Sequence, residues 1–100
     1  MGQTENRYQA KLKKKIKERF PGCIVLKNDP TMTQGIPDLL ILYGDRWAAL
    51  ECKRESKSST RPNQPYYVEK MNEMSYASFI CPENEEEVLN AVQRSFETCR

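Results

Sequence analysis

Residues 35–55, with the sequence GIPDLLILYGDRWAALECKRE, form the densest apolar stretch of this 100-residue chain. Two apolar runs, 38–43 and 46–53, lie on either side of Gly44-Asp45. Glycine at the first of two central positions suits a type II′ turn, which joins antiparallel strands. The stretch therefore predicts a β-hairpin that carries ionisable residues at the end away from its turn.

The hairpin register brings these ionisable residues together. If Gly44-Asp45 is the turn, counting outward from it places Asp38 opposite Glu51. Side chains alternate between the two faces of a strand, and directly opposed residues share a face. Asp38, Glu51 and Lys53 are therefore expected on one face, at one end of the hairpin.

Two carboxylates about 5 Å apart repel each other by roughly 3 kcal/mol at an effective dielectric constant near 20. A Mg²⁺ ion, with Mn²⁺ as a possible substitute, would compensate this charge, because Mg²⁺ takes one or two protein carboxylates and keeps several waters. The alternative is a salt-bridge cluster in which Lys53, Arg46 and Arg54 neutralise the two acids.

Length and composition limit the classes of function. One hundred residues predict a single domain over 1–100, with its core at about 4–98. The chain has no histidine, which excludes Ser-His and Cys-His nucleophiles and histidine-bound metals. The net charge of +2 is too small to indicate a polyanionic partner. Without a membrane span or a signal peptide in the sequence, we expect a cytoplasmic protein with no membrane partner.

The rest of the chain predicts three helices and two further strands. Tyr8, Leu12, Ile16 and Phe20 recur every four residues after a possible cap at Thr4, and Pro21-Gly22 ends that helix. The β-branched run 23–28 predicts a strand, and the polar, aperiodic segment 54–63 predicts a mobile loop.

The C-terminal third predicts a helix, a strand and a helix. Pro65 suits a first helical turn, with Tyr67, Met71 and Met74 as the buried stripe. A strand follows over 76–81, and Asn84 with Glu87 forms a plausible capping pair for the last helix. The expected class is α/β with the order α-β-β-β-α-β-α and a central mixed sheet flanked by helices. The four cysteines form no C-x-x-C pair, and burial explains them better than zinc.

The hairpin motifs resemble those of a known nuclease superfamily. Ile36-Pro37-Asp38 at a strand start, followed by Glu51-Cys52-Lys53 at the next strand end, is similar to the PD-(D/E)xK signature. The predicted element order is similar to the restriction-endonuclease-like core of that superfamily. Small size and the Gly35-Ile-Pro-Asp form most resemble stand-alone VRR-NUC domains, with Holliday-junction resolvases close behind.

The resemblance implies roles for the residues of the two motifs. Asp38 and Glu51 would bind the metal ion, the backbone carbonyl of Cys52 could be a third ligand, and Lys53 would be the catalytic lysine. In these families a glutamate of the first helix often lies near the metal, which suggests Glu5.

Two of the implied residues have alternative explanations. Glu5 shares the inward stripe of Tyr8 and Leu12, but an acidic residue in a first turn also favours the helix dipole. Gln64 could hold the lysine or a water in the site, or could simply precede Pro65 at a helix start. The segment 61–66, RPNQPY, departs from the usual basic and apolar run around that glutamine.

The resemblance also implies a DNA partner. Arg54, Lys57 and Arg61 follow the catalytic lysine and could contact phosphates, as could Lys14 on the lysine-rich face of the first helix. For that helix face, a solvated surface is the simpler explanation. Tyr66 could stack on unpaired bases. Branched DNA and a homodimer with two metal sites would fit a domain of this size, and Met32, Met74 and the Tyr66-Tyr67 pair could lie at its interface.

The leading interpretation is a Mg²⁺-dependent DNA endonuclease that hydrolyses phosphodiester bonds, structure-selectively at Holliday junctions or flaps. A restriction-type or exonucleolytic enzyme on the same core would instead cut linear duplex best. A non-catalytic nucleic-acid-binding module would keep the fold and use the acidic cluster structurally.

Overall fold

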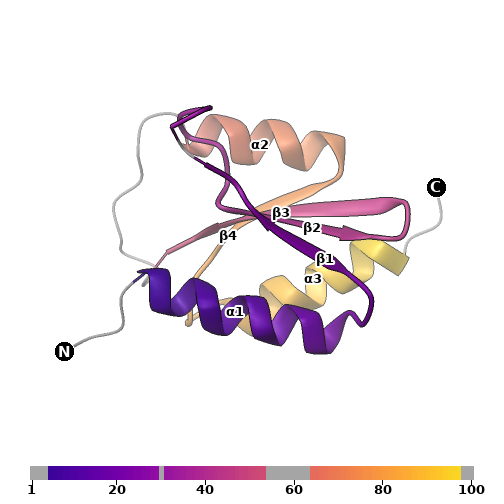
Figure 1. The fold of residues 1–100 in the computed structure, drawn as a ribbon. Helices are drawn as coiled ribbons and strands as arrows, with labels where there is room; N and C mark the ends of the chain where they lie inside the picture. Colours follow the sequence, from indigo (N-terminus) through magenta and orange to yellow (C-terminus); the bar gives the residue numbers. More distant parts are fainter. Residues whose placement is uncertain (1–4, 30, 54–63, 98–100) are drawn as a thin grey trace.

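The order of helices and strands in the computed structural model is the one predicted (Figure 1). The structure describes residues 5–29, 31–53 and 64–97. The elements are α1 (Glu5–Arg19), β1 (Ile24–Lys27), β2 (Leu39–Tyr43), β3 (Arg46–Cys52), α2 (Gln64–Met74), β4 (Tyr76–Ile80) and α3 (Glu85–Glu97).

The four strands form one mixed sheet between two layers of helix. The strand order is β1-β2-β3-β4, with the first two pairings antiparallel and β3 parallel to β4. Helix α2 covers one face, while α1 and α3 cover the other (Figure 1). The α2 helix therefore connects two parallel neighbours, as a crossover between parallel strands requires. The predicted α/β class with a mixed sheet is confirmed.

The main core lies between the sheet and the α1/α3 layer. The predicted stripe of α1, with Leu12 and Ile16 fully buried, packs against Leu39, Ile41 and Leu50 of the sheet. At the hairpin-turn end, the ring of Phe20 lies 5.2 Å from that of Phe96 and 5.7 Å from that of Tyr43, measured between centroids. A smaller cluster of Ala49, Val68 and Ala77 lies under α2.

The hairpin has the predicted turn and register. Gly44 has a φ of 65°, and none of the described non-glycine residues has a positive φ. A positive φ at the first central position only is the pattern of a type II′ turn. The pairing runs from Tyr43 opposite Arg46 to Leu39 opposite Leu50, so one further step places Asp38 opposite Glu51.

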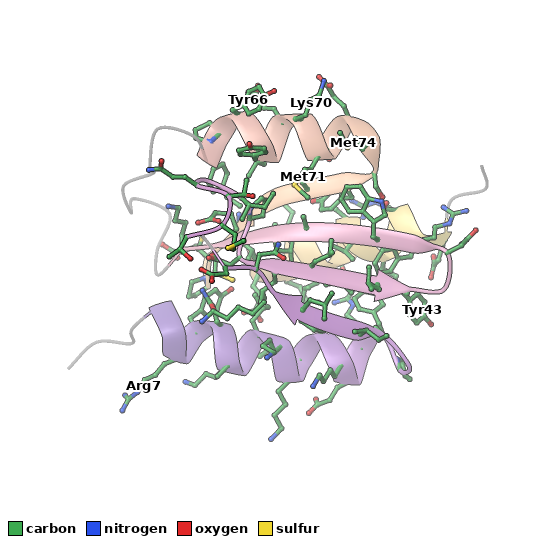
Figure 2. The ribbon with its side chains drawn as sticks, turned by 45° about the horizontal axis from the view of Figure 1, so that its top comes forward. Arg7, Tyr43, Tyr66, Lys70, Met71 and Met74 are labelled. Carbon is green, nitrogen blue, oxygen red and sulfur yellow. The ribbon has the colours of Figure 1, made fainter. Side chains whose placement is uncertain are left out.

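The stripe predicted for α2 is partly wrong. Val68 is buried, Tyr67 and Met71 are half-buried, and Met74 is 65% exposed. Figure 2 shows Met71 on the sheet side of α2, with Tyr66 and Lys70 on its outer side. The side of α2 that faces the sheet is centred on Val68 and Met71, which lie three residues apart. Met74 is the last residue of the helix and lies at the border of that side, where it is exposed.

The capping pair predicted for the last helix is not found among the described residues. Asn84 directly precedes α3, but its carboxamide oxygen accepts a hydrogen bond from the N–H of Cys81 rather than from the first turn of the helix, which ties the end of β4 to the helix start. Among the described cysteines, Cys52 and Cys81 are buried and Cys23 is half-buried, all as free thiols. No described helix is both long enough and apolar enough to cross a membrane.

Candidate active site

The candidate site lies at the end of the sheet opposite the hairpin turn, along the edge that the strand ends form. Antiparallel pairing brings the end of β1, the start of β2 and the end of β3 to this edge. Because β4 starts beside Ala48, at the turn end, the helix that leads into it must start at the site end. The first turn of α2 and the predicted cluster therefore share one edge.

Asp38 stands one residue before β2 and is held by the neighbouring strand. Its Oδ2 accepts a hydrogen bond of 2.9 Å from the backbone N–H of Cys52. The carboxylate thus takes the place of a backbone acceptor where the hairpin ladder runs out. The half-buried Asp38 side chain is fixed against the end of β3.

Glu51 and Lys53 lie on the face of the sheet that α2 covers. They alternate in register with Ala49, which belongs to the cluster under α2. Glu51 is 1% exposed and Lys53 is 8% exposed. The Lys53 ammonium lies 4.0 Å from Glu51 Oε2 and 5.8 Å from the centroid of the Phe79 ring. The structure therefore brings two acids and a lysine together, as the register predicted.

Burial of Asp38 raises the pKa of its carboxyl group above the ordinary aspartate value. The Cys52 N–H, the charges of Lys27 and Lys53 and a hydrogen bond with the Glu51 side chain act in the opposite direction. The effect of burial is larger than the sum of these effects, so the protein does not fully compensate the negative charge of the Asp38 carboxylate. A proton shared with Glu51 or a bound cation would supply the missing positive charge.

The donor set fits a hard divalent cation. Asp38 and Glu51 supply carboxylate oxygens. The carbonyl of Cys52 leaves β3 on the same side as its N–H, toward Asp38, because both groups of a residue in an antiparallel strand point to the same neighbour. Among the described residues no group of three or more His, Cys, Asp or Glu side chains could hold a metal. Two carboxylates and waters are nevertheless a usual Mg²⁺ environment.

The other two predicted site residues begin helices on opposite faces of the sheet. Gln64 starts α2, on the face and at the edge where Lys53 lies. Glu5 starts α1, which covers the other face; Tyr8, one turn further along, packs in the same core cluster as Cys52, which places this end of α1 at the same edge. The side chains of both residues lie outside the described part, so their roles remain predictions.

Of the predicted DNA contacts, the structure describes Lys14 and Tyr66, which lie in the helical layers on opposite faces of the sheet. Arg54, Lys57 and Arg61 lie outside the described residues. Lys14 is exposed on α1, in the layer across the sheet from Glu51. Tyr66 is 60% exposed in the first turn of α2, on the same side of the sheet as Lys53, and packs edge-on against Tyr67 at 5.1 Å.

The sequence prediction missed Asn28 and Phe79, which support the site. Asn28 binds the backbone on both sides of the Asp38 α-carbon, and Phe79 lies beside the Lys53 ammonium. The sequence shows Asn28 only as the polar residue at the end of a β-branched run; its place opposite Asp38 follows from the β1–β2 register. Phe79 could be found only once β3 and β4 were known to be parallel neighbours.

Comparison with known proteins identifies the fold. No family model and no curated protein sequence matches this chain. A solved structure described as a VRR_NUC domain protein superposes with a TM-score of 0.68 at 18% sequence identity, covering 97% of this chain and 91% of that one. The chain therefore has the fold of a VRR_NUC domain protein, as the motif resemblance implied.

Proposed function

We propose that this protein is a Mg²⁺-dependent DNA endonuclease that hydrolyses phosphodiester bonds, structure-selectively at Holliday junctions or flaps. The observation that carries the proposal is the convergence of Asp38, Glu51 and Lys53 at one sheet edge. The fold shared with a VRR_NUC domain protein supports a nuclease.

Asp38 and Glu51 would hold the cation, together with the carbonyl of Cys52. When bound, Mg²⁺ polarises a phosphoryl oxygen and makes water a better nucleophile. The protein contributes fixed ligands: the Cys52 N–H orients Asp38, and the burial of Glu51 restricts its rotamers.

Lys53 would place positive charge beside the reacting phosphate. Its ammonium group can donate up to three hydrogen bonds. It lies 4.0 Å from Glu51 Oε2 and 5.8 Å from the centroid of the Phe79 ring. Such a donor can orient a water or stabilise the charge that develops on a phosphate oxygen in the transition state. Because the stem is buried, little side-chain entropy is lost when the substrate binds.

Branched DNA and a homodimer are the finer parts of the proposal. The α2 helix contacts β3 and β4, while Ile24 on the edge strand β1 is 56% exposed and Leu26 is 44% exposed. Together with the exposed Met74, these side chains offer apolar surface to a second copy. Two copies would present two metal sites, which suits cleavage of two strands at a junction.

The test is cleavage of junction, flap, single-stranded and linear duplex DNA with Mg²⁺. We expect cleavage of a branched substrate that disappears in both Asp38→Asn and Glu51→Gln. Asp45→Asn and Glu73→Gln are matched controls, because these acids are exposed and distant from the site, and both should keep full activity.

Three results would contradict the proposal. Activity that survives in both site variants would exclude this mechanism. DNA affinity in a protein that binds neither Mg²⁺ nor Mn²⁺ would identify a non-catalytic binding module, whereas preference for linear duplex would point to a restriction-type or exonucleolytic enzyme.

A further inference from the structure

Asn28 makes two hydrogen bonds to the chain around Asp38. Its backbone N–H donates to the carbonyl oxygen of Asp38 at 2.7 Å, one step beyond the last β1–β2 pair. Its side-chain Nδ2 donates to the carbonyl oxygen of Pro37 at 2.8 Å. One residue of the edge strand thus contacts both peptide groups that flank the Asp38 α-carbon.

These two bonds fix the backbone conformation of Asp38. The φ and ψ angles of a residue are the rotations that relate its α-carbon to the two flanking planar peptide groups. The carbonyl of Pro37 belongs to the first group and the carbonyl of Asp38 to the second. With both groups held by Asn28, the direction of the Asp38 Cα–Cβ bond is determined.

The side-chain bond is needed because the ladder stops at this point. Pro37 has no N–H and is fully buried, and the chain reaches it through Gly35 with a φ of 88°. In a regular β2–β3 ladder the Pro37 carbonyl would accept from the Cys52 N–H; because that N–H binds the Asp38 carboxylate instead, the carboxamide of Asn28 supplies the donor.

We propose that Asn28 is a positioning residue for the metal site, acting through the backbone of Asp38. The inference rests on the proposed function, in which Asp38 binds the cation. Asn28 fixes the backbone of Asp38 and Cys52 fixes its carboxylate, so the ligand is held in place before the cation arrives.

The test compares Asn28→Ala with Asn72→Ala. Asn72 makes a similar side-chain bond to a backbone atom, accepting from the N–H of Ala77 at 3.1 Å, but at the turn end of the molecule. Both variants lose one such bond, so both should lose similar stability. Only Asn28→Ala should raise the Mg²⁺ concentration for half-maximal cleavage and weaken Mn²⁺ binding in calorimetry, by about 10- to 100-fold.

Amide hydrogen exchange separates this inference from the proposed function. The Cys52 N–H is protected by the Asp38 carboxylate, so Asn28→Ala should speed its exchange about tenfold relative to Asn72→Ala. If the wild-type protein binds no metal, the proposed function fails and the exchange rate still decides whether Asn28 positions Asp38. Unchanged Cys52 exchange in Asn28→Ala, or equal effects of the two variants on metal binding, would overturn the inference.

Discussion

The backbone N–H of Cys52 donates a hydrogen bond of 2.9 Å to Oδ2 of Asp38. This contact joins the two strands of the hairpin through a side chain at the point where Asp38 faces Glu51. It orients one carboxylate beside another that is almost completely buried. The site is therefore built by the hairpin itself, with α2 and β4 enclosing its Lys53 side.

Replacing Asp38 should separate activity from stability. In Asp38→Asn the carboxamide oxygen can still accept from the Cys52 N–H, while the buried negative charge is lost. We expect cleavage to fall by more than about 100-fold, since loss of a metal ligand should exceed the cost of losing a supporting contact. Urea unfolding in EDTA should show a variant at least as stable as the wild type near neutral pH. A clear loss of stability would mean that the carboxylate mainly holds the hairpin together.

The raised pKa of Asp38 predicts how stability depends on pH without metal. Because burial raises the folded-state pKa, folding favours the protonated form, and this contribution is fully present below the unfolded-state pKa. It is lost as pH rises from the ordinary aspartate value through the raised value. In EDTA, as pH rises above the ordinary aspartate pKa, the wild type should lose unfolding free energy relative to Asp38→Asn.

Magnesium should suppress that pH dependence, because a cation stabilises the charged carboxylate and binds only the folded protein. The measurement is urea unfolding of both proteins across the pH range, with EDTA or with excess Mg²⁺. A wild type that gains stability over the variant as pH rises in EDTA would contradict the prediction. The hydrogen bond and the lysines would then outweigh burial, and the pKa of Asp38 would be lowered rather than raised.

Lys53 should affect catalysis more than metal binding. Lys53→Met keeps an unbranched apolar stem beside Phe79 and removes the ammonium group. We expect single-turnover cleavage at saturating Mg²⁺ to fall by about 10²-fold or more, while Mn²⁺ affinity in calorimetry stays within a few-fold. Lys70→Met, on the exposed side of α2, is the matched control. Equal losses of cleavage rate in both lysine variants would mean that Lys53 contributes only non-specific electrostatic attraction to DNA.

Gln9 offers a test of the packing on α1. Its side chain is 6% exposed, and its Oε1 has no hydrogen-bond partner among the described atoms. A buried acceptor in this state costs about 1–3 kcal/mol, so Gln9→Met should raise the free energy of unfolding by about 1 kcal/mol. Gln93→Met should lower it, because Gln93 accepts hydrogen bonds from Arg19. Destabilisation by Gln9→Met would contradict this assignment.

The hairpin was predictable because its determinants are local. The turn residues Gly44-Asp45 set the register, and strand alternation then placed Asp38, Glu51 and Lys53 on one face. The stripe of α1 was predictable for a similar reason, since four apolar residues repeat at helical spacing before Pro21. In these segments the sequence period and the tertiary packing demand the same structure.

The parts that sequence reasoning missed depend on contacts between distant segments. The exposure of Met74 follows from where α2 meets β3 and β4, which its own periodicity does not specify. Phe79 lies 26 positions after Lys53 and reaches it only through the parallel pairing of β3 with β4. The opposite locations of α1 and α2 likewise follow from how the helices cover the sheet, so the separation of Lys14 from the site face was not visible in the sequence.

Anomalous diffraction from crystals soaked in Mn²⁺ tests the central claim most directly. The account predicts a manganese peak within coordination distance of carboxylate oxygens of both Asp38 and Glu51, and its absence from Glu51→Gln crystals treated identically. A wild-type protein that cleaves DNA in Mn²⁺ and shows no peak between these two carboxylates, or binds the ion only elsewhere, would contradict it.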